Sequence, residues 1–179
     1  HDGRRRLVVS LKVCMATNHL LRNTSLGGHA WVFLNWALGL RALDCKLVLL
    51  EQLGKNADFE ALPEQLQRLN VEFQALGLDV EMVFVVRPEH AERYAAIQAD
   101  LAERGLSGIV RPWQEAAAEV DVLLNFRYLL PEHVVRSFQR SALIDIDPGL
   151  LQCWIHEGQL APVSHDIYFS IGETVGQPG

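Results

Sequence analysis

Short apolar runs recur along the chain and alternate with longer segments in which apolar and polar residues mix. Within the runs hydrophobicity is nearly continuous, as in KLVLL at residues 46–50. Such runs predict strands buried on both faces, which is typical of parallel strands in α/β proteins. We expect strands at residues 7–16, 46–51, 80–86, 120–125, 142–146 and 167–171.

Helices are predicted between these strands by the residues that mark helix ends. Proline begins the segments 63–76 and 88–104, and a glycine follows each of them. This is the usual placement of proline at the start and glycine past the end of a helix. Further helices are expected over 31–43, 131–139 and 148–157, whereas 54–62 is irregular and 108–118 fits a short strand plus a helical turn. Right-handed crossovers then predict an α/β, Rossmann-like, doubly wound, mainly parallel sheet with helices on both faces.

Length and composition favour one packed domain over residues 1–179. A chain of 179 residues with 49% apolar and 21% charged residues has enough apolar side chains for one sizeable core, which excludes wholesale disorder. The sequence opens with a histidine and stops without a closing element. These ends are typical of a processed chain or of part of a longer polypeptide.

Charge and cysteine content exclude several classes. The net charge of −6 and a single basic run at residues 4–6 argue against nucleic-acid binding. Three cysteines without a Cys-x-x-Cys pair indicate neither a disulfide framework nor a zinc site, and a cytoplasmic location fits them. No apolar run is long enough for a transmembrane segment. The Gly-x-Gly-x-x-Gly fingerprint of dinucleotide enzymes is missing, so no cofactor is expected.

The longest predicted loop, residues 17–28, is the first candidate for a substrate site. In open α/β sheets ligands bind outside the carboxyl ends of the strands, and this loop follows the first strand. It contains Asn18 and His19 and ends in the pair Gly27-Gly28. Glycines permit a positive φ and a close approach to a ligand, and a helix N-terminus offers free N–H groups. A plain tight turn is the alternative interpretation.

His29 stands where the helix after this loop is expected to begin. Imidazole is the side-chain group most often used to accept a proton from a hydroxyl group, so His29 is a candidate general base. The alternative is an ordinary capping or solvent-facing histidine.

Acidic residues follow two later strands. Asp145 and Asp147 lie two apart, so both carboxylates share one face of a strand and are candidates to orient a base or hold a metal. Asp147 directly before Pro148 is equally typical of a helix N-cap. Glu173 and Thr174 follow the last predicted strand and would border the same crevice.

Residues 26–51, a glycine-glycine-histidine turn, an apolar helix and an aliphatic strand, resemble the N-terminal half of glycosyltransferases with the GT-B fold. Residues 142–149 and 165–169 are similar in layout to the late strands of such a domain. The resemblance implies that residues 1–179 are a single GT-B half, the acceptor-side domain, and the N-terminal half of a longer two-domain protein. A nucleotide-sugar donor would be bound mainly by a separate C-terminal domain, and no metal would be required. It further implies that His29 acts as base and that Asp147 orients it.

Two other interpretations stay open. The first is a Rossmann-like module without catalytic activity that binds a small phosphorylated ligand or a partner at the glycine turn. The second treats residues 145–147 as the Asp-x-Asp motif of the metal-dependent GT-A glycosyltransferases.

Overall fold

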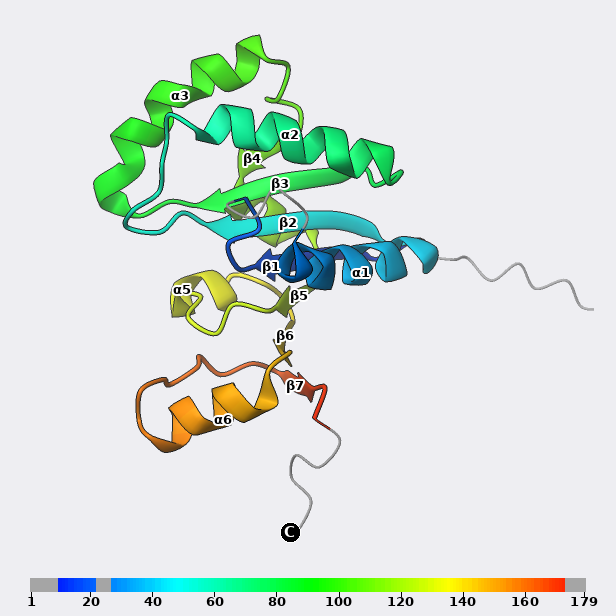
Figure 1. Cartoon of the computed structure of the whole chain (residues 1–179), viewed down its shortest axis with the longest axis vertical. Helices are drawn as coiled ribbons and strands as arrows, with labels where there is room; N and C mark the ends of the chain where they lie inside the picture. Colours follow the sequence, from blue (N-terminus) through cyan, green and yellow to red (C-terminus); the bar gives the residue numbers. More distant parts are fainter. Residues whose placement is uncertain (1–9, 22–26, 173–179) are drawn as a thin grey trace, which may run out of the picture.

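The computed structural model describes residues 10–21 and 27–172 and shows one seven-stranded, all-parallel sheet (Figure 1). Its strand order is β4-β3-β2-β1-β5-β6-β7. The strands are β1 (Lys12–Thr17), β2 (Lys46–Gln52), β3 (Val80–Val85), β4 (Val110–Pro112), β5 (Val122–Asn125), β6 (Ser141–Asp145) and β7 (Ile167–Ser170). The chain thus builds the sheet outward from β1 to β4, then returns to place β5 on the other side of β1. This confirms the expected Rossmann-like α/β architecture.

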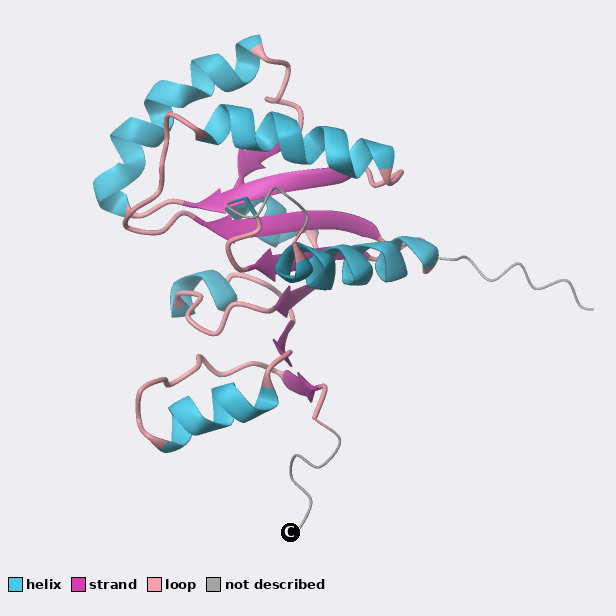
Figure 2. Ribbon diagram, in the orientation of Figure 1, coloured by secondary structure: helices cyan, strands magenta, loops and turns pink. Residues whose placement is uncertain are grey.

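Helices cover both faces of the sheet (Figure 2). They are α1 (Gly28–Ala42), α2 (Leu62–Ala75), α3 (Ala91–Glu103), α4 (Trp113–Glu119), α5 (Glu132–Val135) and α6 (Pro148–His156), with a 3-10 turn at Pro88–His90. Met15 and Leu49 point to a core shared with α1, α2 and α3, whereas Cys14 and Val48 point to a core shared with α4 and α5. Burial on both faces is the physical reason that the strands read as continuous apolar runs.

Residues 108–118 contain β4 and nearly all of α4, in line with the expected short strand plus helical turn. Other element boundaries differ from the sequence expectations. The first strand begins only at Lys12 within the described residues. The helix expected over 131–139 is only four residues long, because Ser137 and Phe138 donate to carbonyls three residues back. That tighter turn ends the helix and places the Phe138 ring in the second core.

The strand order creates a crevice where neighbouring connections diverge. β1 pairs with both β2 and β5, and the helices after β1 and β5 lie on opposite faces of the sheet. The carboxyl ends of β1, β5 and β6 therefore meet at the point where doubly wound folds bind ligands. No helix in the described part of the chain is long and apolar enough to cross a membrane.

Candidate functional site

A cavity of about 430 Å³ opens at the carboxyl ends of β1, β5 and β6. Its polar lining comes from the ends of these strands and the start of α1, and its apolar lining comes from α1, from the residues after β5 and from α6 and its flanks. The lining residues are Asn18, His19, His29, Phe33, Phe126, Arg127, Tyr128, Leu129, Ile146, Asp147, Leu150, Trp154 and Leu160. Four of the residues expected at a site from the sequence, namely Asn18, His19, His29 and Asp147, are thus brought to one cavity.

His29 lies in the first turn of α1, exposed at the mouth of this cavity. Its Nε2 lies 2.5 Å from the carbonyl oxygen of Asn18. A carbonyl oxygen only accepts, so in this contact Nε2 carries the hydrogen. In the neutral ring the lone pair is then on Nδ1, which is the atom that can accept a proton.

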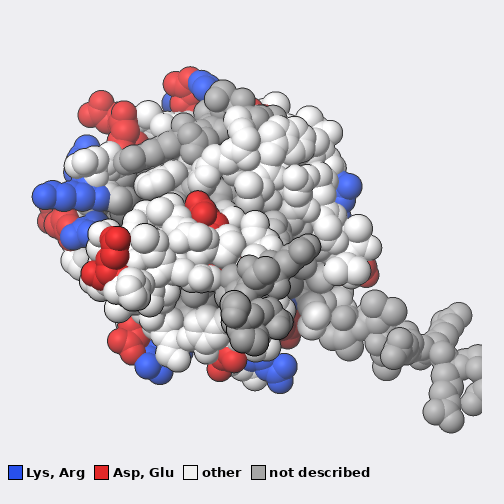
Figure 3. Space-filling model, turned by 60° about the horizontal axis from the view of Figure 1, so that its bottom comes forward, with Lys and Arg blue, Asp and Glu red and all other residues white. Residues whose placement is uncertain are grey.

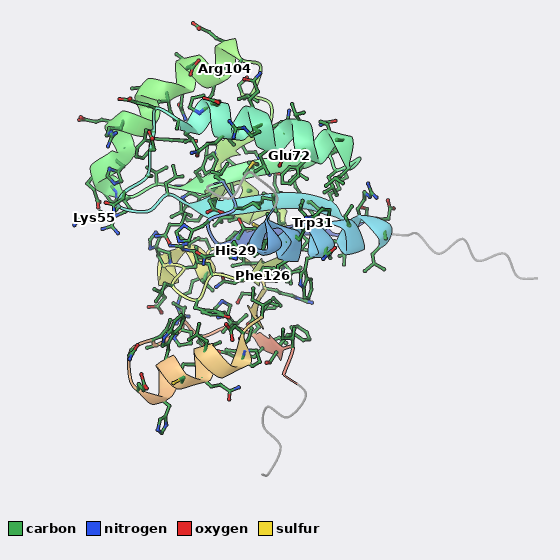
Figure 4. The ribbon with its side chains drawn as sticks, in the orientation of Figure 1. His29, Trp31, Lys55, Glu72, Arg104 and Phe126 are labelled. Atoms are coloured by element: carbon green, nitrogen blue, oxygen red, sulfur yellow. The ribbon has the colours of Figure 1, made fainter. Side chains whose placement is uncertain are left out.

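The imidazole of His29 packs against Phe33, which in turn packs against Phe126. The ring of Phe33 contacts His29 edge to face, with centroids 5.2 Å apart, and contacts Phe126 in the same way at 5.6 Å. Figure 4 shows His29 and Phe126 close to the start of α1. Because Phe33 and Phe126 are both buried, they form a rigid floor for the polar end of the cavity.

Arg127, the second residue after β5, is hydrogen-bonded to side chains at the carboxyl ends of β1 and β2. Its Nε donates to Oε1 of Gln52 at 2.8 Å and its Nη1 donates to Oδ1 of Asn18 at 2.7 Å. Its own N–H is fixed at 2.9 Å by the side-chain oxygen of Asn125. These bonds keep a permanent positive charge at the cavity, beside the N-terminus of α1.

A buried carboxyl group lies beneath the loop after β1. Glu51, at 3% exposure, accepts a hydrogen bond from the Thr17 hydroxyl at 2.5 Å and further bonds from the backbone N–H groups of His19 and Leu20. His19 adopts a left-handed backbone conformation, φ 57, which is uncommon for a residue with a side chain. Burial raises the pKa of Glu51, although the Thr17 hydroxyl and Arg127 oppose the shift.

The acidic pair at the end of β6, Asp145 and Asp147, performs two different structural tasks. Asp147 is the N-cap of α6, since its Oδ1 accepts from the N–H of Leu150 at 3.4 Å. Asp145 is buried and accepts from the Tyr128 hydroxyl at 3.1 Å and from the Ser170 hydroxyl at 3.2 Å. Burial and this carboxylate raise the pKa of Tyr128 to about 12. No group of three metal-ligating side chains occurs within residues 10–21 and 27–172.

Gly27 and Gly28 do not use the positive φ that glycine permits. Gly27 has φ −63 and Gly28 is the first residue of α1, whereas the described glycines with positive φ are Gly77, Gly105 and Gly158. A Cβ at Gly27 or Gly28 would meet nothing within 4 Å. The turn is therefore open toward solvent and not conformationally strained.

Two predicted site residues lie outside the described part of the chain, and three residues near the cavity were not predicted from the sequence. Glu173 and Thr174 lie outside the described residues. Glu51, Arg127 and Tyr128 were missed, although Glu51 ends a predicted strand and the other two follow one within three residues, which is the signal that could have found them. Comparisons with protein-family models, with curated proteins and with solved structures found no match to this chain.

Proposed function

We propose that this chain is the acceptor-side domain of a glycosyltransferase with the GT-B fold. The observation that carries the proposal is the imidazole of His29, held at a crevice between β1 and β5 with its Nδ1 lone pair unused by the Asn18 contact. In doubly wound folds this crevice is where substrates bind. A nucleotide-sugar donor would be held mainly by a second domain that faces it.

The reaction would begin with the acceptor hydroxyl in the cavity beside His29. The hydroxyl proton passes to Nδ1 while the oxygen forms a bond to the anomeric carbon of the donor sugar. The bond from that carbon to the diphosphate oxygen breaks, and the nucleoside diphosphate leaves with the electron pair. We propose that Asp147, at the same cavity, orients the imidazole when substrate is bound. Asn18, His19, Gly27 and Gly28 would contact the substrates.

A single substitution tests the role of His29. In the full-length protein that contains this chain, His29→Ala should lower kcat for sugar transfer by about 10²- to 10⁴-fold. The ring is exposed, so the melting temperature should change by only a few degrees. His29→Gln, which keeps a donor toward Asn18, is the matched control and should be as inactive as His29→Ala. Turnover equal to the wild type in either variant would exclude His29 as the base.

Arg127 favours a second candidate function, a module that binds a small phosphorylated ligand without chemistry. A guanidinium and the N-terminus of α1 border one cavity, which suits an anion. This function predicts that nucleoside diphosphates raise the melting temperature of the 179-residue chain by itself. A thermal shift without any sugar transfer by the full-length protein would favour this candidate over the transferase.

A further inference from the structure

The α6 side of the cavity is almost wholly apolar. Of the residues that α6 and its flanks contribute, Ile146, Leu150, Trp154 and Leu160 are apolar, and Asp147 accepts the N–H of Leu150. Phe33 and Phe126 continue this surface at the floor. We propose, on the basis of the glycosyl transfer proposed above, that the acceptor carries its hydroxyl on an apolar ring system and not on a sugar.

Helix α6 is built to present this apolar wall. Leu150 and Trp154 are four residues apart, so they lie on one side of the helix, one turn from each other. Leu150 is 42% exposed, which means that a large aliphatic side chain faces the open cavity. Filling the cavity with an apolar body removes that surface from water.

The chain after α6 completes the wall. The helix ends in a turn in which Gly158 has φ +69, and the N–H groups of Gln159 and Leu160 both donate to the carbonyl oxygen of Trp154, at 2.8 and 3.2 Å. These bonds return Leu160 to the cavity beside Trp154. The Asp147 cap and these backbone bonds therefore fix both ends of the helix that carries the wall.

The two sides of the cavity therefore suit different chemical groups of a ligand. The β1 and β5 side offers His29, Asn18, Arg127 and Tyr128, which suit one hydroxyl and a nearby anionic group. The α6 side would leave the hydroxyls of a sugar without partners, and each lost hydrogen bond weakens binding. An aromatic alcohol meets both conditions, with its ring against Trp154 and its hydroxyl toward His29.

Charged side chains are spread over the face of the molecule that Figure 3 shows. In the face viewed in Figure 3, the described acidic and basic side chains are scattered, mostly around the rim, and do not gather in a patch of one sign. This face therefore offers no patch of one sign to a charged partner.

Binding of two uncharged probes to the 179-residue chain tests the inference. We expect 2-naphthol, two fused aromatic rings with one hydroxyl, to bind in isothermal titration, and methyl glucoside to bind at least tenfold more weakly. Trp154→Ala and Leu150→Gln should each weaken 2-naphthol binding by about tenfold. Ile155→Gln is the matched control, because Ile155 is a 45% exposed apolar residue of the same helix that does not line the cavity.

The outcomes separate this inference from the proposed function. Tighter binding of methyl glucoside, or 2-naphthol binding that neither Trp154→Ala nor Leu150→Gln weakens, would overturn the apolar acceptor. Transfer by the full-length protein to sugar acceptors but not to 2-naphthol would also overturn it, while the transferase function would stand. Trp154-dependent 2-naphthol binding without transfer from any nucleotide sugar would support the apolar site and contradict the transferase. Circular dichroism of each variant confirms that it is folded.

Discussion

Replacing Glu51 by glutamine should change how the stability of the protein depends on pH. The carboxyl is 3% exposed and burial raises its pKa above about 4.5, so the native state binds a proton that the unfolded chain has released. Native wild-type protein therefore loses stability as the pH rises from about 4.5 through the native pKa. Glu51→Gln resembles the protonated acid in shape but cannot ionise, so this loss is removed.

The size of the effect follows from proton linkage. The free energy of unfolding of Glu51→Gln minus that of the wild type should grow with pH by up to about 1.4 kcal/mol per pH unit, until the native carboxyl is ionised. Urea unfolding at a series of pH values, followed by tryptophan fluorescence, measures this difference. Glu103→Gln removes the same charge at an exposed position on α3 and is the matched control.

A second substitution examines the hydrogen bond to the same carboxyl. Thr17→Val removes the hydroxyl that donates to Glu51 and should cost about 1–2 kcal/mol. In a double-mutant cycle with Glu51→Gln, the two changes should not be additive, because they share this bond.

A Glu51→Gln difference that stays constant or falls between pH 4.5 and 8 would refute the reasoning that the carboxyl is protonated by burial.

Other changes test the fold around the cavity. Burial lowers the pKa of His165, so the wild type should lose stability as the pH falls below about 6.5, because the unfolded chain takes up the proton first. His165→Asn should lack this dependence in thermal unfolding between pH 5 and 7.5. Identical pH profiles of the two proteins would contradict this reasoning. Gly28→Ala should raise the free energy of unfolding by about 0.5–1 kcal/mol in urea, because Gly28 is helical and a Cβ meets open space; a loss would show strain at the turn. Phe126→Ala should lower it by about 3–5 kcal/mol, because the ring packs edge to face against Phe33 and Trp36, and a loss under 1 kcal/mol would show that the floor is not packed.

The sequence alone determined the elements and their type. Runs that are apolar on every position require burial on both faces, which a parallel sheet between two helical layers provides. The proline and glycine signals for helix ends are equally local: Pro63 lies in the first turn of α2, and Gly77, with φ +66, follows its end. For Asp147, which precedes Pro148, the sequence leaves open an N-cap, a residue that orients a base and a metal ligand. Its bond to Leu150 shows the cap, while its proposed part in orienting the base stays a prediction.

Only the tertiary structure decided which residues meet at the site. Arg127 is 75 residues from Gln52 and 109 from Asn18 along the chain, and the three side chains meet only because β5 pairs with β1 and not with β4. Local propensity carries no information about that strand order, since it depends on which crossover buries the most apolar surface. The sequence could therefore indicate the loop after the first strand, whereas the cation, the buried Glu51 and the apolar wall of α6 required the packed sheet.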